Sequence, residues 1–224
     1  MNLETKKIKI KEPLLLIGGG SFKERTLKKS LKFSKFIVAV DGGANHLKNI
    51  VPEYIIGDLD SLKNKNLWYQ KEAKIIKVKE QNTTDFEKSL YTFDSSLYLC
   101  IGFTGGRIDH FFSVCSSLIK NSEKKIILIG KRDLIFHLPK RFKINLPIGS
   151  RFSLIPFEKD AKLSSNGLKW RLESLKLNFS QKISISNQTD NDQVIIKNSK
   201  KGILGIIEKK FLKNLIESMN INNL

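Results

Sequence analysis

The segment EYIIGDLDSL, residues 53–62, places two carboxylates directly after a short apolar run. Residues 54–56 do not alternate between polar and apolar, which is typical of a strand buried on both faces of a parallel sheet. Gly57 ends the run, and Asp58 and Asp60 follow it. Because side chains of an extended chain repeat every two residues, we expect both carboxylates to point in the same direction. The segment therefore predicts a parallel sheet with acidic groups at the end of one strand.

Further apolar runs of the same kind lie on either side of this segment, and segments of helical length separate several of them. The runs are 14–17, 36–40, 75–78, 97–101 and 126–129, and the helical segments are 85–93 and 107–120. Strands alternating with helices predict an α/β fold with a mostly parallel sheet in a three-layer arrangement.

The pattern changes after Pro139, where short alternating runs and turn residues replace the helical period. The runs are 151–155, 168–172, 182–186, 193–196 and 203–207, and helical spacing returns over 211–219. Short strands at regular spacing indicate an all-β sandwich. We therefore predict an α/β domain over residues 1–140, followed by a β-sandwich domain over residues 141–224 that ends in a short helix.

Composition sets broad limits on the class of protein. The chain has 224 residues and a formal charge of +18, from 40 Lys and Arg against 22 Asp and Glu. A basic surface attracts polyanions, but the lysines are scattered along the whole chain, which favours a solvated lysine surface.

Cys100 and Cys115 lie inside apolar patterns and form no CxxC pair, which indicates reduced thiols. With no apolar segment long enough to span a membrane, we expect a cytoplasmic protein without a membrane partner.

Acids, glycines and cations gather after the predicted strands, where open parallel sheets bind their ligands. Asp41 to Asn45 follows one strand, Asp85 opens a helix after another, and a glycine-rich segment, 102–110, follows a third. Each feature alone fits a turn or a helix cap, but so many carboxylates at one edge would repel each other without a cation. Mg²⁺ suits such oxygen ligands, glycines let backbone N–H groups approach phosphate, and Lys88 and Arg107 would balance phosphate charge. The combination predicts Mg-nucleotide phosphoryl transfer, although the P-loop and protein-kinase motifs are absent from the sequence.

Several segments, matched in order along the sequence, carry a specific resemblance that covers the chain from about residue 14 to residue 207. VAVDGGANHL, IIGDLDSL, QNTTDFEKSL and GFTGGRIDH, followed by SNGLKWRL with SISN, resemble the thiamine pyrophosphokinase (thiamine diphosphokinase) family. The resemblance implies an α/β catalytic domain followed by a β-sandwich. It also implies transfer of a diphosphoryl group from MgATP to the hydroxyl of thiamine, with release of AMP. ATP and thiamine are then the partners, Mg²⁺ the cofactor and a homodimer the assembly, and no nucleic-acid partner is expected.

The same resemblance implies a role for individual residues. The acids that bind Mg²⁺ are Asp58, Asp60 and Asp85, which form the catalytic group together with Lys88. The nucleotide-binding residues are Asp41, Gln81, Lys88, Arg107 and Asp109. The residues that hold thiamine are Trp170, Ser184 and Asn187. We expect placement of metal and charge to matter more than general-base catalysis, because an aspartate is a weak base and proton loss can lag in a loose transition state.

Two alternatives remain open at this point. One is a non-catalytic nucleotide- or RNA-binding protein, which the positive charge favours and the intact set of acids disfavours. The other is a diphosphotransferase acting on another alcohol such as a pterin, which the GLKW and SISN segments disfavour. Without these segments, Trp170 would be interpreted as a core residue of the sandwich.

Overall fold

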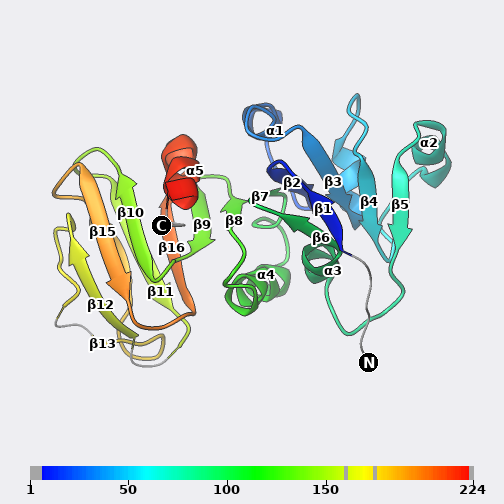
Figure 1. Ribbon diagram of the computed structural model, residues 1–224. Helices are drawn as coiled ribbons and strands as arrows, with labels where there is room; N and C mark the ends of the chain where they lie inside the picture. The colour runs from blue at the N-terminus through cyan, green and yellow to red at the C-terminus, as the bar shows by residue number, and fades with distance from the viewer. Residues whose placement is uncertain (1–6, 159–160, 174–175, 222–224) are drawn as a thin grey trace. The chain divides into compact units, whose positions relative to one another are not determined.

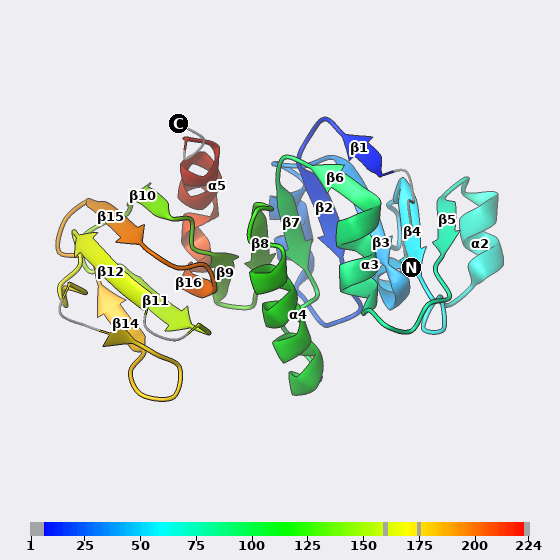
Figure 2. The ribbon, with the colours of Figure 1, turned by 60° about the horizontal axis from the view of Figure 1, so that its bottom comes forward.

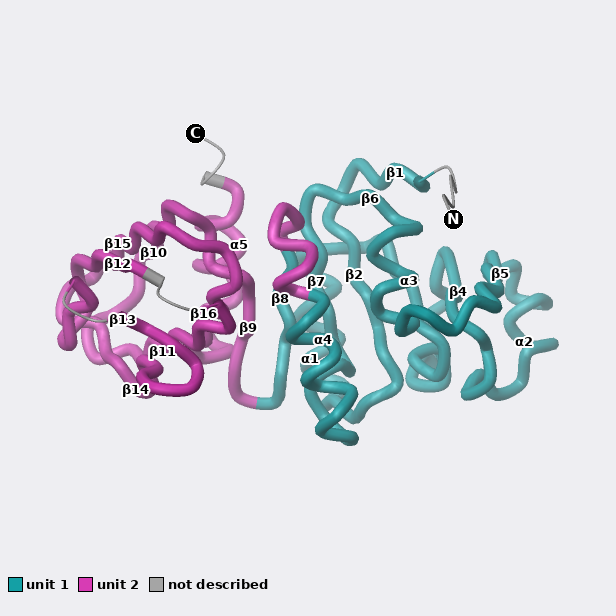
Figure 3. Tube along the Cα trace, turned by 90° about the horizontal axis from the view of Figure 1, so that it is seen from below, with its two compact units in different colours: residues 1–117, 126–131 teal, residues 118–125, 132–224 magenta. Residues whose placement is uncertain are grey.

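A computed structural model describes residues 7–158, 161–173 and 176–221. The chain divides into two compact units, 1–117 with 126–131 and 118–125 with 132–224 (Figure 3). Residues 132–140, which the sequence placed in the first domain, belong to the second unit. The reason is strand pairing, because β9 (Asp133–His137) is antiparallel to β16 (Ile203–Glu208).

The first unit is built on a parallel sheet of order β8-β7-β2-β3-β4-β5 (Figure 1). Its strands are β2 (Leu14–Ile17), β3 (Phe36–Val40), β4 (Tyr54–Gly57), β5 (Lys74–Lys77), β7 (Tyr98–Ile101) and β8 (Ile126–Ile129). Every neighbouring pair in this order is parallel. Each residue of β2, β7 and β8 is buried, as unbroken apolar runs require. The α/β prediction is confirmed.

Helices cover both faces of this sheet. They are α1 (Glu24–Ser30), α2 (Lys65–Gln70), α3 (Asp85–Thr92), α4 (Ile108–Lys120) and a 3₁₀ turn, η1 (Asp41–His46). In Figure 1, α1 lies above the sheet and α3 below it, and Figure 2 shows α3 and α4 on the same face. Thr84 and Glu87 form a reciprocal capping box that fixes the start of α3. Outside the main sheet, β1 (Ile8–Ile10) pairs with β6 (Phe93–Ser95).

The second unit contains two antiparallel sheets, ordered β10-β15-β12-β13 and β14-β11-β16-β9. Their other strands are β10 (Arg141–Asn145), β11 (Arg151–Pro156), β12 (Ala161–Asn166), β13 (Lys176–Leu177), β14 (Ser184–Gln188) and β15 (Gln193–Asn198), followed by η2 (Lys209–Phe211) and α5 (Leu212–Ile221). The ring of Phe142 on β10 lies 5.1 Å from that of Phe136 and 6.2 Å from that of Phe152, which belong to the other sheet. This aromatic contact joins the two sheets, and the predicted all-β domain with a terminal helix is confirmed.

One predicted strand is wrong. Residues 168–172 form only a single bridge, between Leu168 and Thr189. Gly167 precedes them with φ +83°, and a Cβ there would lie 2.1 Å from the carbonyl oxygen of Gln193. The chain therefore turns at Gly167 and leaves the sheet. In its place, β12 supplies the strand beside β15.

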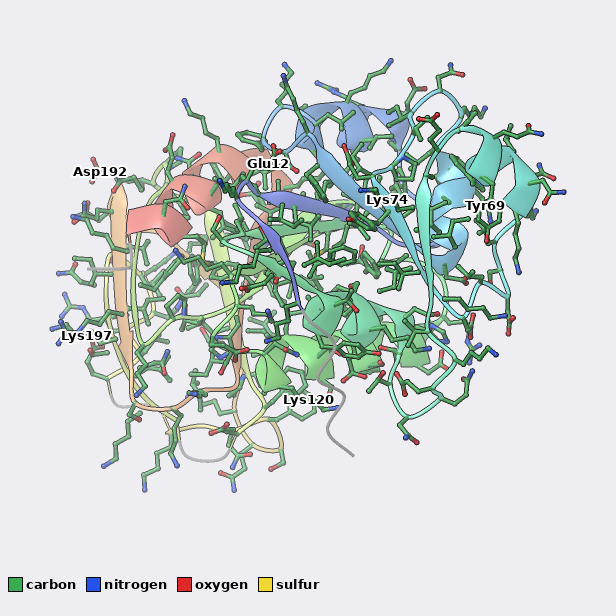
Figure 4. The ribbon with its side chains drawn as sticks, turned by 45° about the vertical axis from the view of Figure 1, so that its right-hand side comes forward. Glu12, Tyr69, Lys74, Lys120, Asp192 and Lys197 are labelled. Carbon is green, nitrogen blue, oxygen red and sulfur yellow. The ribbon has the colours of Figure 1, made fainter. Side chains whose placement is uncertain are left out.

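Charged side chains are distributed over both units. Lys74 of β5 and Lys197 of β15 are both exposed and come from different units (Figure 4). Among the described residues, no helix is long and apolar enough to span a membrane.

We expect the stability of the second unit to depend on pH because of one buried histidine, His137. The residue is 8% exposed, and its Nε2 accepts the backbone N–H of Gly202 at 3.1 Å. The pKa of His137 is lowered to about 4, mainly by burial and also by the charge of Lys201, while Glu123 opposes the shift. Because the folded pKa lies below the unfolded value of about 6.5, this stabilisation is complete above pH 6.5 and is lost as the pH falls toward 4.

We expect the wild-type protein to lose about 3 kcal/mol more unfolding free energy than His137→Gln between pH 7 and pH 4. Glutamine keeps an acceptor for the Gly202 N–H but does not titrate. Urea unfolding of both proteins at several pH values measures the difference. Parallel pH profiles would show that His137 is not the titrating group.

Candidate active site

A cleft of ≈ 730 Å³ lies at the carboxyl ends of the parallel strands, within the first unit. Its walls are formed by the turns after β2, β3, β4 and β7, by the loop that enters α3 and by the first turns of α4. This is the edge at which the sequence predicted a ligand site. The predicted residues that line it are Asp41, Asp58, Gln81, Asp85, Lys88 and Arg107.

Three carboxylates converge at one end of this cleft. Asp41, Asp58 and Asp85 each offer one oxygen, and these oxygens all lie within 4.8 Å of one another. Gly57, at the end of β4, makes this possible, since its φ is +151° and a Cβ there would lie 3.0 Å from Asp41 Cβ and 3.3 Å from Asp85 Cγ. Glycine at this position therefore leaves the space in which the acids meet. We call these three residues the acidic triad.

The geometry of the acids differs from the one that strand alternation predicted. Leu59 has φ +69°, in the left-handed region, so Asp58 and Asp60 do not extend from one regular strand. Asp60 is exposed and lies outside the acidic triad, and its backbone N–H donates to Asp58 Oδ1 at 3.1 Å. The expectation of a shared direction is therefore wrong, while the metal role of Asp60 stays a prediction. Asp41, expected to bind nucleotide, is the third acid and has φ +46°.

Lys88 provides a cation beside the acidic triad. Its residue is 1% exposed, and its Nζ lies 3.0 Å from Asp85 Oδ1. Asp58 donates its backbone N–H to the same oxygen at 3.2 Å. Burial raises the pKa of Asp85, and the nearby charges of Asp58 and Asp41 raise it further, whereas Lys88 opposes the shift. The raised pKa therefore reflects mainly a carboxylate removed from water, with a smaller contribution from the two neighbouring acids.

The acidic triad fits a divalent cation. Its donors are all carboxylate oxygens, the ligand type that Mg²⁺ prefers. A bound cation would also offset the effects of burial and of the Asp58 and Asp41 charges, which together raise the pKa of Asp85. The acidic triad therefore offers the ligand type and the negative charge that suit a divalent cation.

Arg107 and Asp109, expected to contact nucleotide, form a pair with each other. Arg107 Nε lies 3.1 Å from Asp109 Oδ1, and Nη2 lies 2.6 Å from Oδ2. Both side chains are exposed, and the hydrogen bond from Arg107 lowers the pKa of Asp109 to about 2. Asp109 thus offsets the charge that Arg107 would offer to a phosphate.

Two glycine turns in the cleft are explained by packing against each other. Gly102 has φ +80°, and a Cβ on it would lie 2.3 Å from the carbonyl oxygen of Gly18. Gly20 donates its backbone N–H to the carbonyl of Gly102 at 2.9 Å, and its own Cβ would collide with the same oxygen. The backbone N–H of Gly20 therefore forms a hydrogen bond within the chain rather than pointing at a phosphate.

The three residues expected to hold thiamine lie together in the second unit. Asn187 accepts the backbone N–H of Trp170 at 3.1 Å and donates its amide to the Trp170 carbonyl at 2.7 Å and to Ser184 Oγ at 3.5 Å. Asn187 is 2% exposed, whereas Trp170 is 53% exposed. Asn187 therefore fixes the backbone of Trp170, and the ring of Trp170 remains available to a ligand. The alternative of a core tryptophan is excluded by this exposure.

Asn45 and Lys63 also line the cleft, and sequence reasoning assigned them no role. Asn45 donates its amide to the Ser61 carbonyl at 2.9 Å and accepts the Lys63 N–H at 3.0 Å. It thereby holds the loop that follows Asp58. The signal available in the sequence was the polar end of the DGGAN segment, whose asparagine can pair with backbone in both directions.

Comparisons with known proteins agree with this architecture. Residues 27–129 match the family model "Thiamin pyrophosphokinase, catalytic domain", and residues 135–204 match "Thiamin pyrophosphokinase, vitamin B1 binding domain". Thiamin pyrophosphokinase 1 of Caenorhabditis elegans is 33% identical over 194 residues, covering 77% of this chain and 79% of the relative.

Solved structures show the same fold. Thiamin pyrophosphokinase from Candida albicans superposes with a TM-score of 0.79 at 22% identity, covering 90% of this chain and 93% of that one. The yeast enzyme gives a TM-score of 0.76 at 22% identity, covering 97% and 96%. With both family models matched in order along the sequence, this chain belongs to the thiamin pyrophosphokinase family.

Proposed function

We propose that this protein is a thiamine diphosphokinase, which transfers a diphosphoryl group from MgATP to the hydroxyl of thiamine and releases AMP. The observation that carries the proposal is the acidic triad with Lys88, at the strand ends where α/β proteins bind ligands. The matches to both the catalytic and the vitamin B1 binding models support the choice of substrate.

In this proposal Asp58 and Asp85 hold Mg²⁺, with Asp60 as a further ligand. Asp41 is the third carboxylate of the acidic triad. Mg²⁺ would supply positive charge to the phosphate oxygens when it is bound. The acidic triad fits this role because the oxygens of Asp41, Asp58 and Asp85 already lie within 4.8 Å of one another.

Lys88 stabilises the charge that develops on the transferred phosphoryl oxygens. Its ammonium is held at 3.0 Å from Asp85 in a buried position, so little reorganisation is needed when the substrate binds. Gln81 and Arg107 lie on the cleft wall and, with Asp109, contact the nucleotide. The proton of the thiamine hydroxyl leaves late, so a strong general base is not required.

Trp170 offers an aromatic face to the cationic substrate, an interaction of roughly 0.5–2 kcal/mol. Lys169 Nζ lies 5.0 Å from the centre of the same ring, so a bound cation would displace this side chain. Asn187 and Ser184 keep the segment of Trp170 in place.

We expect Trp170→Ala to raise the KM for thiamine about tenfold and to leave the KM for ATP within about twofold. Its exposure of 53% predicts little loss of stability. The other tryptophan, Trp68, is 4% exposed and provides the matched control. Trp68→Ala should lower the unfolding free energy by about 3–5 kcal/mol. It should not change the KM for thiamine more than the KM for ATP. Equal changes in both KM values for Trp170→Ala would contradict the thiamine role.

One assay tests the proposed function. Purified protein with ATP and thiamine should form AMP and thiamine diphosphate in equal amounts in Mg²⁺, and neither in EDTA. A hydroxymethyl pterin in place of thiamine tests the other diphosphotransferase class. ATP binding without turnover of either alcohol would favour the non-catalytic alternative.

The proposal includes a homodimer in the cytoplasm. Ile108 and Phe112, one turn apart on α4, are 72% and 54% exposed and offer apolar surface for association. Cys100 and Cys115 are buried free thiols, which supports the cytoplasm as the proposed compartment. Sedimentation equilibrium measures the assembly.

A further inference from the structure

Glu80 ties together the loop between β5 and α3. Its Oε2 accepts the backbone N–H of Asn82 at 2.8 Å and that of Thr83 at 3.1 Å. Its Oε1 accepts the hydroxyl of Thr83 and, at 3.1 Å, the hydroxyl of Tyr91. Because Tyr91 belongs to α3, a single carboxylate fixes the loop both to itself and to the helix that carries Asp85 and Lys88.

This arrangement acts on the cleft through the neighbours of Glu80. Gln81, Thr83 and Thr84 line the cleft. The hydrogen bond from the Thr83 hydroxyl is the main cause that lowers the pKa of Glu80, with the N–H of Asn82 and the Tyr91 hydroxyl adding to it. The carboxylate is therefore ionised at neutral pH, when it is the strongest acceptor for these donors.

We propose that Glu80 is a positioning residue for nucleotide binding: it holds segment 81–84 in the shape that the cleft presents to ATP. The inference rests on the proposed function. A loop that is already ordered does not have to lose conformational freedom when the ligand binds, so its order contributes directly to affinity. Loss of Glu80 should therefore weaken the binding of nucleotide and leave the binding of thiamine unaffected, since the contacts of Glu80 all lie within the first unit.

The two oxygens of Glu80 have different partners, and this difference provides a sharp test. The partners of Oε2 are backbone N–H groups, which only donate, whereas the partners of Oε1 are hydroxyls, which can also accept. Glu80→Gln can therefore keep all four contacts, with its carbonyl toward the N–H groups and its NH₂ toward the hydroxyls. Glu80→Ala loses all four.

The experiment measures hydrogen exchange and steady-state kinetics on the full chain. In Glu80→Ala, the amides of Asn82 and Thr83 should exchange faster, and the KM for ATP should rise about tenfold or more, with the KM for thiamine within about twofold. Glu80→Gln should restore both the protection and the KM for ATP. Tyr91→Phe removes one contact of four and should give a smaller rise.

Several results would overturn the inference. One is a Glu80→Ala protein with faster exchange and an unchanged KM for ATP, which would make the role purely structural. Another is a Glu80→Gln protein as impaired as Glu80→Ala, which would make the charge rather than the contacts responsible. If Glu80→Ala does not fold, Glu80→Asp, whose shorter side chain does not reach both the loop and Tyr91, replaces it with the same criteria. A wild-type protein that forms no AMP from ATP and thiamine would instead refute the proposed function, and ATP titration by calorimetry would then still test Glu80.

Discussion

Asp58→Asn is expected to reduce kcat about 10²–10³-fold in saturating Mg²⁺ while leaving the metal-free protein at least as stable as the wild type. Asp58 contributes one of the three oxygens that lie within 4.8 Å of one another, and asparagine removes its charge but keeps the acceptor for the Asp60 N–H. The loss of one negative charge relieves repulsion, which should stabilise the metal-free fold by on the order of 1 kcal/mol after allowance for solvent screening.

The stability measurement separates this interpretation from damage to the fold. Urea unfolding in EDTA should give Asp58→Asn an equal or higher midpoint, and the pKa of Asp85 should fall because Asp58 is one of the charges that raise it. Asp192→Asn, an exposed carboxylate on the second unit (Figure 4), controls for the general effect of removing one negative charge. Near wild-type turnover of Asp58→Asn would show that the acidic triad does not hold the catalytic metal.

Much of the fold could be predicted because its strands are buried on both faces. Runs such as 14–17 and 126–129 have few other interpretations, and the structure contains each of them as a parallel strand. The second unit was harder, because its strands are half exposed. In β12, Ala161–Asn166, the exposed positions include serine and asparagine, which are also common in turns, and the strand was missed. In contrast, LKWRL alternates as a strand should, yet Gly167 turns the chain out of the sheet.

The candidate site was predictable in its location but not in its internal geometry. Strand ends and residue types placed Asp41, Asp58 and Asp85 at one edge, which follows from the chemistry of parallel sheets. Their convergence depends on the positive φ angles of Asp41, Gly57 and Leu59, which sequence periodicity does not reveal. Residues strained in this way are frequent at functional sites, where surrounding contacts hold them. The contacts of Glu80 were equally hidden, since its four hydrogen bonds depend on a loop conformation.

Lys88→Met is expected to lower kcat about 10²–10³-fold and, unlike Asp58→Asn, to destabilise the metal-free protein. Lys88 is 1% exposed and its Nζ lies 3.0 Å from Asp85 Oδ1. Methionine fills most of the volume but leaves the carboxylates of the acidic triad without this cation. Since Lys88 is the influence that lowers the pKa of Asp85, its removal should raise that pKa further.

Magnesium provides the decisive readout for Lys88. A divalent cation at the acidic triad replaces part of the missing positive charge, so Mg²⁺ should raise the Tm of Lys88→Met by more than it raises the Tm of the wild type. Lys29→Met, which removes an exposed lysine from α1, controls for the change in net charge and should show the wild-type response. Thermal unfolding with EDTA and with Mg²⁺, together with turnover of ATP and thiamine, completes the test. Equal Mg²⁺ stabilisation of all three proteins would mean that Lys88 does not neutralise the acids, and its catalytic role would then have to rest on direct contact with phosphate alone.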